Sequence, residues 1–130
     1  MSKKVLIVDD DPDVRLFNST VAEESGYTPV EAANGEEGLK KLKQESPDLV
    51  VLDVLMPKQS GIRLYRILKT EKALKGIPVV ILSGVAKRTF LRSQKALTEF
   101  GDQPVPEPES YLEKPVEPEE LAQEMKKFLE

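Results

Sequence analysis

Three short, uninterrupted apolar runs stand out along the chain: Val5 to Val8, Leu49 to Leu52 and Val79 to Leu82. Runs of this length without polar alternation are typical of strands buried on both faces, as in a parallel sheet covered by helices. Two weaker segments, Thr28 to Val30 and Tyr111 to Leu112, complete a set of five predicted strands. The proline inside the former favours an edge strand, where a missing N–H group is tolerated.

Helical patterns separate the predicted strands. They run from Pro12 to about Glu24, from Asn34-Gly35 to near Pro47, from Ser60-Gly61 through Leu68, from Lys87 to Phe100, and from Pro118 to Leu129. We expect the first helix to bury Val14, Phe17 and Val21 on one face, and the last helix carries a clear amphipathic stripe. Five strand–helix units joined by right-handed crossovers predict a three-layer α/β sandwich with five helices.

One segment interrupts this alternation. Residues 102–110 alternate proline with other residues, which predicts an extended, polyproline-like loop. A chain of 130 residues is sized for one globular domain, and strand and helix patterns resume after the loop. We therefore interpret the segment as an insertion within a single domain spanning residues 1–130. Its role stays open between a tolerated surface loop and a docking element.

Composition excludes several classes of function. A net charge of -4 argues against a surface that binds nucleic acid or anionic membranes directly. The sequence contains no cysteine and no histidine, which excludes disulfides, thiol catalysis and a phosphohistidine within this chain. The apolar runs are too short to cross a bilayer, and the first residues do not resemble a signal peptide. A cytoplasmic location is expected.

Acidic side chains follow two of the predicted buried strands. Asp9 and Asp10 come after the first strand and Asp53 after the third. If these strands are neighbours, the three carboxylates meet at one edge of the sheet, near Ser83 and Lys114, which follow two further strands. Oxygen ligands without histidine or cysteine favour Mg²⁺, with phosphate as a co-ligand. A hydroxyl and an ammonium facing the metal suit an aspartate that is itself phosphorylated.

Asp11 has a simpler explanation than its two neighbours. It precedes Pro12, and aspartate followed by proline is a common start of a helix. We interpret Asp11 as an N-cap and expect Glu113 to face solvent. Loss of Asp10 is expected to weaken Mg²⁺ binding, whereas Asp11→Asn is expected to leave it nearly intact.

Short motifs recur at the ends of the predicted strands. They are Val8-Asp9-Asp10, Leu52-Asp53 with Met56-Pro57 and Gly61, Leu82-Ser83-Gly84, and Tyr111-Leu112-Glu113-Lys114-Pro115. In this order they resemble the receiver domain of two-component response regulators, to which the chemotaxis regulator belongs. The resemblance covers nearly the whole chain. It implies a flavodoxin-like parallel sheet of order 2-1-3-4-5 and suggests a cis bond before Pro115.

The resemblance also implies a role for each acidic residue. Asp53 would accept a phosphoryl group from the phosphohistidine of a histidine kinase or a histidine phosphotransfer protein. Asp10 and Asp53 would bind Mg²⁺ directly, Asp9 would help through water, and the Leu55 carbonyl would supply a further ligand.

Ser83 and Lys114 would bind the phosphoryl oxygens. Ser83 and Tyr111 would also form a switch that transmits the phosphorylation state to a surface made by the fourth helix and the fifth strand. The positions two residues after Asp53 and after Ser83 often flank the attacking water in this family, and here they are Leu55 and Val85. We therefore expect slow loss of the phosphoryl group.

These features favour a signalling module over an enzyme. We expect a stand-alone receiver, or else a piece of a longer regulator, that catalyses only its own phosphorylation and dephosphorylation. It would act by changing its binding to a downstream protein, as a monomer or a phosphorylation-dependent dimer.

Three alternatives carry different expectations. A pseudo-receiver acting only as a binding adaptor would not need intact Asp53, Ser83 and Lys114. A Mg²⁺-dependent phosphatase with an aspartyl nucleophile would typically carry a second aspartate at position 55. A flavin-binding electron carrier would place its phosphate against the acids after the first strand, which would repel it.

Overall fold

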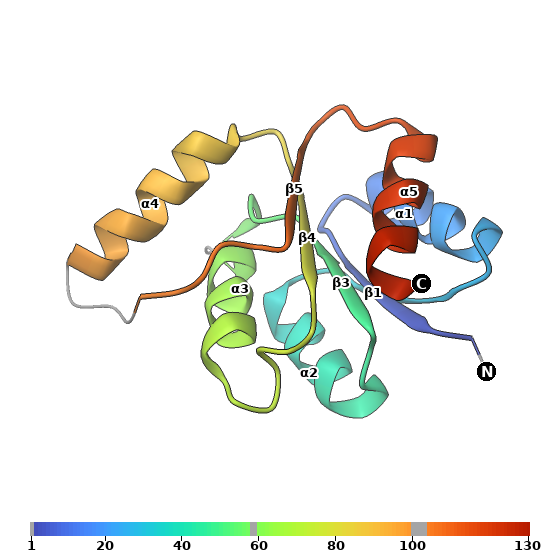
Figure 1. The fold of residues 1–130 in the computed structure, drawn as a ribbon, viewed down its shortest axis with the longest axis horizontal. Coiled ribbons are helices and arrows are strands. Elements are labelled where there is room, and N and C mark those ends of the chain that lie inside the picture. The colour runs from blue at the N-terminus through green and yellow to red at the C-terminus, as the bar shows by residue number, and fades with distance from the viewer. Residues whose placement is uncertain (1, 58–59, 100–103) are drawn as a thin grey trace.

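The computed structural model describes residues 2–57, 60–99 and 104–130 (Figure 1). The strands are β1 (Lys4–Val8), β2 (Thr28–Ala32), β3 (Leu49–Leu52), β4 (Val79–Ser83) and β5 (Ser110–Glu113). The helices are α1 (Pro12–Glu24), α2 (Gly35–Glu45), α3 (Ser60–Thr70), α4 (Lys87–Glu99) and α5 (Pro118–Leu129). Each predicted strand and helix is confirmed, although the predicted end of the fourth helix at Phe100 lies outside the described residues. Within the described ranges, no helix is long and apolar enough to cross a membrane.

The strands form one parallel sheet in the order β2-β1-β3-β4-β5, which confirms the predicted flavodoxin-like architecture and the edge position of β2. Val8, the last residue of β1, is in register with Ala32 on one side and with Leu52 on the other. β1 and β3 therefore end at the same level. The residues that follow them, Asp9 and Asp53, leave the sheet side by side.

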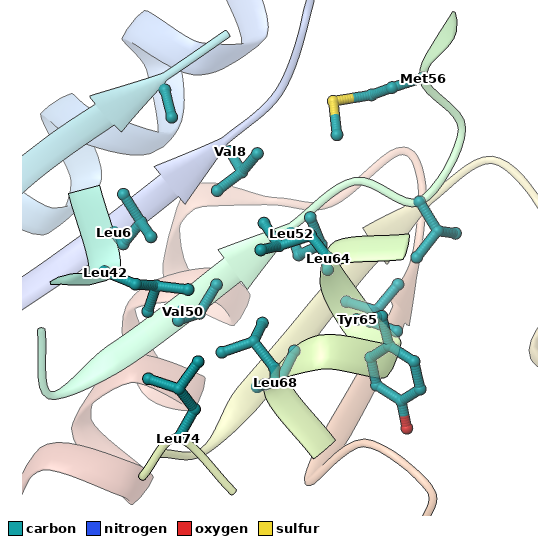
Figure 2. Close-up of a cluster of buried hydrophobic side chains, with 14 of the residues drawn as sticks. Leu6, Val8, Leu42, Val50, Leu52, Met56, Leu64, Tyr65, Leu68 and Leu74 are labelled. Carbon is teal, nitrogen blue, oxygen red and sulfur yellow. The ribbon is translucent and has the colours of Figure 1, made fainter. Parts of the chain in front are cut away.

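Apolar side chains fill both faces of the sheet. Leu6 and Val8 belong to the cluster drawn in Figure 2, between the sheet and residues of α2, α3 and α4. Val5 and Ile7 belong to a second cluster with residues of α1 and α5. All four side chains are at most 1% exposed. The uninterrupted apolar run of β1 is thus explained by burial on both faces.

Helix α1 differs from the prediction on one point. Phe17 is 42% exposed and Leu16 is 61% exposed, so the expectation that Phe17 faces the core is wrong. The buried positions of α1 are Asn18, Ser19, Val21 and Ala22. The predicted face of Val14, Phe17 and Val21 has helical spacing. The stripe of α1 that is actually buried is centred about one residue further along the helix and includes small or polar side chains. Hydrophobic periodicity alone does not locate such a stripe.

The proline-rich segment is anchored to α3 and β4. Residues 104–109 form no helix or strand. The Tyr65 hydroxyl donates a hydrogen bond to the carbonyl of Pro106. The carboxylate of Glu109 pairs with the buried ammonium of Lys69 and accepts a hydrogen bond from the Val79 N–H at 2.7 Å. Residues 102–103 of the predicted insertion lie outside the described residues, and the prediction is wrong for its last residue, Ser110, which begins β5.

Gly61 lies where two backbone segments approach each other closely. A Cβ atom at this position would be 2.5 Å from the carbonyl oxygen of Asp53 and 2.7 Å from the Cα of Val54. Such distances are too short for any side chain, so the glycine lets the first turn of α3 pack directly on the loop after β3. This contact fixes the backbone that carries Asp53.

We expect Gly61→Ala to lower the free energy of unfolding by about 1–3 kcal/mol, the usual cost of overpacking. Gly76→Ala is a matched control, because a Cβ there would meet nothing within 4 Å and its φ lies outside the left-handed region. Urea denaturation of the two variants measures the difference. Equal stability of the two variants would contradict the close-approach interpretation of Gly61.

Candidate functional site

The candidate site lies at the carboxyl edge of β1 and β3. The N–H of Asp9 donates to the Ala32 carbonyl at 3.1 Å, and the N–H of Asp53 donates to the Val8 carbonyl at 3.0 Å. These bonds extend the ladders of the sheet by one residue beyond the strands. The backbone of both aspartates is therefore held by the sheet itself.

Three carboxylates converge at this edge, as predicted. Ligand oxygens of Asp9, Asp10 and Asp53 all lie within 4.8 Å of one another. Asp9 and Asp53 are only 2% and 7% exposed, whereas Asp10 is exposed. Oxygen donors alone, with two of them buried, suit a small hard divalent cation. The residues present fit Mg²⁺.

Lys114 supplies positive charge to the cluster. Its Nζ lies 3.3 Å from Oδ2 of Asp9 and 3.5 Å from Oδ2 of Asp53. Its backbone N–H donates to the Ser83 carbonyl at 2.8 Å, which ties the residue after β5 to the end of β4. The bond between Lys114 and Pro115 is cis, as the resemblance suggests. One ammonium cannot balance three carboxylates, so the cluster keeps a negative charge that favours a cation.

Backbone N–H groups fix the other oxygens of the two buried carboxylates. Oδ1 of Asp9 accepts a hydrogen bond from the Asp11 N–H at 2.9 Å, and Oδ1 of Asp53 accepts one from the Leu55 N–H at 2.9 Å. In each case Oδ2 is the oxygen that faces Lys114. The side chain of Leu55 is 57% exposed beside the site, and its carbonyl as a metal ligand stays a prediction.

Burial raises the pKa of the Asp53 carboxyl above its ordinary value of 3.8. The hydrogen bond from Leu55 and the charge of Lys114 lower the pKa of Asp53, and the nearby charge of Asp9 raises it further. Desolvation is the largest of these effects, so the ionised form of Asp53 is disfavoured in the metal-free fold. A bound cation would favour the ionised form.

The two predicted switch residues meet at Val85. Ser83 is fully buried at the end of β4, and its Oγ accepts a hydrogen bond from the Val85 N–H at 3.1 Å. The hydroxyl of Tyr111 donates to the Val85 carbonyl at 2.6 Å. The Tyr111 ring also contacts Phe90 of α4, with ring centroids 5.5 Å apart. The loop after β4 thus links the site to α4 and β5.

Asp11 forms the predicted N-cap. Its Oδ1 accepts hydrogen bonds from the N–H groups of Asp13 at 2.9 Å and Val14 at 3.4 Å. Its carboxylate is therefore engaged by the helix and differs in role from those of Asp9 and Asp10. Glu113 is exposed, as expected.

Sequence reasoning missed Arg15. This residue lies one turn into α1, and its Nη1 donates to the carbonyl oxygen of Asp9 at 2.8 Å. The only signal in the sequence is its place four residues after the N-cap, from which a long side chain can reach back over the helix start. No residue pattern distinguishes this role from that of a surface arginine.

Comparison with known sequences gives a consistent result. A family model described as "Response regulator receiver domain" matches residues 5–126. The phosphate regulon transcriptional regulatory protein PhoB of Escherichia coli K12 is 32% identical over 126 residues, which cover 97% of this chain and 51% of that protein. The alkaline phosphatase synthesis transcriptional regulatory protein PhoP of Bacillus subtilis is 41% identical over 83 residues, which cover 64% and 34%. The chain spans about half or less of the length of these relatives.

Solved structures resemble the fold over its full length. The chemotaxis response regulator CheY4 of Vibrio cholerae superposes with a TM-score of 0.80 at 27% identity, covering 99% of this chain and 100% of that one. A CheY-like response regulator receiver domain protein from Methanospirillum hungatei gives a TM-score of 0.79 at 28% identity, covering 99% and 94%.

The raised pKa of Asp53 leads to a prediction for the metal-free protein. A carboxyl whose pKa is higher in the fold than in the unfolded chain destabilises the fold when ionised, and this cost disappears as the pH falls and the carboxyl is protonated. We therefore expect Asp53→Asn to raise the free energy of unfolding at neutral pH. The gain should shrink as the pH approaches 3.8.

Urea denaturation between neutral and acid pH, with a chelator present, measures this gain. Asp11→Asn is the matched control, because it removes one acidic charge nearby and asparagine caps a helix equally well. A gain of the same size in both variants would point to general charge repulsion instead of the burial of Asp53.

Proposed function

Because the chain belongs to the response regulator receiver domain family, we propose that Asp53 accepts a phosphoryl group from the phosphohistidine of a kinase or a phosphotransfer protein. Receiver domains are signalling modules that histidine kinases phosphorylate, and they generally bind Mg²⁺ in an acidic pocket. One observation carries the proposal. Three carboxylates lie within 4.8 Å of one another, and the Lys114 ammonium lies within 3.5 Å of two of them.

In the proposed reaction, Oδ2 of Asp53 attacks phosphorus and the histidine nitrogen of the donor leaves with the electron pair of the broken bond. Lys114 already faces Oδ2 at 3.5 Å and would hold an oxygen of the incoming group. The Leu55 N–H keeps the other oxygen, Oδ1, in place. Asp9, Asp10 and Asp53 would hold Mg²⁺, with the Leu55 carbonyl as a further ligand. When bound, Mg²⁺ neutralises charge on the carboxylates and the phosphoryl oxygens.

The proposed response begins at Ser83. Its Oγ accepts from the Val85 N–H, and it would exchange this bond for one to a phosphoryl oxygen. Because the Tyr111 hydroxyl is bonded to the Val85 carbonyl, a shift of the loop would move Tyr111 and its contact with Phe90 of α4. The output would be a change in the binding of a downstream protein. We further propose that residues 1–130 form one receiver domain, with residues 102–110 as an insertion.

The proposal predicts a covalent change that intact-mass measurement detects. After incubation with Mg²⁺ and acetyl phosphate, the wild type should gain one phosphoryl group and Asp53→Ala should gain none. Asp11→Asn should be modified like the wild type, whereas Asp10→Asn should need more Mg²⁺. No modification of the wild type would contradict the proposal and would favour a protein-binding adaptor.

The lifetime of the phosphoryl group provides a separate prediction. The side chain of Leu55 is 57% exposed beside Asp53, and Val85 lies in the loop after β4. Both are apolar, so neither can orient an attacking water through a hydrogen bond. Leu55→Asn should shorten the lifetime several-fold in a decay assay after removal of acetyl phosphate. An unchanged or longer lifetime would contradict this explanation.

A further inference from the structure

Arg15 is a charged residue beside the cluster to which the proposed phosphoryl transfer assigns no role. Its side chain is only 20% exposed and bonds to two separate segments of the chain. Nη1 donates to the carbonyl of Asp9 at 2.8 Å, and Nε donates to Oε1 of Glu31, on β2, at 3.2 Å. The guanidinium therefore donates from two of its edges, which fixes its orientation.

The carbonyl that Arg15 binds belongs to the peptide group between Asp9 and Asp10. The preceding peptide group is held as well, because the Asp9 N–H donates to the Ala32 carbonyl at 3.1 Å. The backbone of Asp9 is thus fixed at both of its polar groups. Asp10 follows directly and is exposed, so the direction of its carboxylate depends on the orientation of this peptide plane.

Charge alone does not account for an arginine at this place. A guanidinium close to a cation site repels the cation, which would weaken the binding of Mg²⁺. The contact is instead to a neutral carbonyl, and the separate nitrogens of arginine let it bond this carbonyl and Glu31 at once. Residues that orient metal ligands in this way act on metal affinity although they do not touch the metal.

We propose that Arg15 is a positioning residue for Mg²⁺ binding. By fixing the peptide between Asp9 and Asp10, it holds the exposed Asp10 carboxylate near those of Asp9 and Asp53 before the cation binds. Glu31 sets the orientation of the guanidinium. Ordering the ligand in advance removes a cost that binding would otherwise carry. The inference rests on the proposed function, since it requires that this cluster binds Mg²⁺.

Calorimetric titration of the unphosphorylated protein with Mg²⁺ tests the proposal. Arg15→Met should raise the dissociation constant by about tenfold, as expected for the loss of an outer-shell partner. Arg15→Lys keeps the charge but has one nitrogen in place of the two that reach Asp9 and Glu31, so it should also bind Mg²⁺ more weakly. Because loss of a nearby positive charge would by itself tighten binding, weaker binding in Arg15→Met identifies positioning as the cause.

Two further measurements separate positioning from a structural role. Glu31→Gln keeps an acceptor for Arg15 and should bind Mg²⁺ nearly as the wild type does, whereas Glu31→Ala should bind more weakly. With acetyl phosphate as donor, Arg15→Met should need more Mg²⁺ for half-maximal phosphorylation and should keep a maximal rate near that of the wild type.

The proposal is overturned if Arg15→Met binds Mg²⁺ as tightly as the wild type or more tightly, whatever its thermal stability. A lower melting temperature with unchanged affinity would show a structural role only. Failure of the wild type to bind Mg²⁺ would overturn the proposed metal site itself, and this result is distinct from a failure of the Arg15 variants.

Discussion

The ammonium of Lys114 stands between two buried carboxylates, and the rest of the site depends on how their charge is balanced. Asp9 and Asp53 each use one oxygen to accept a backbone N–H and turn the other toward Lys114. Neither side chain can relax toward solvent, because both are nearly fully buried. The exposed Asp10 adds a third negative charge that Lys114 does not balance. Burial and like charge make this cluster costly for the fold, and perturbed carboxylates of this kind are common at functional sites.

The sheet fixes the positions of these charged side chains relative to one another. Register places the ends of β1 and β3 at one level, and ladder bonds extend one residue beyond each strand. Gly61 lets α3 press on the backbone after Asp53, and the guanidinium of Arg15 holds the backbone after Asp9. The acidic side chains are therefore carried by backbone that is bonded or packed from several sides.

Much of this could be predicted from the sequence, because strands buried on both faces appear in it as uninterrupted apolar runs. The apolar runs of β1, β3 and β4 identified the central strands, and the acidic residues that follow β1 and β3 identified the cluster of carboxylates. The N-cap role of Asp11 followed from the proline after it. Phe17 was placed wrongly because the contact stripe of α1 uses small and polar side chains, which hydrophobic periodicity does not mark.

Arg15 was missed for a different reason. Its partner is a backbone carbonyl, and every residue in a sequence offers one. Contacts of this kind become visible only when the fold places one particular carbonyl within reach. The anchoring of residues 104–109 was hidden in the same way, since Tyr65 also donates to a carbonyl and Lys69 finds its partner 40 positions along the chain.

That anchoring has an evolutionary consequence. Lengthening a surface loop costs little, about 0.6 kcal/mol for each doubling of its length, so loop length alone does not oppose a change in this segment. Because Glu109 is the partner of the buried Lys69, however, deletion of the segment would leave an unpaired charge in the interior, at a cost of about 3–5 kcal/mol. Avoiding this cost would first require a neutral residue at position 69. A deletion of this segment would therefore depend on an earlier change at position 69, which constrains the order in which the two changes can occur.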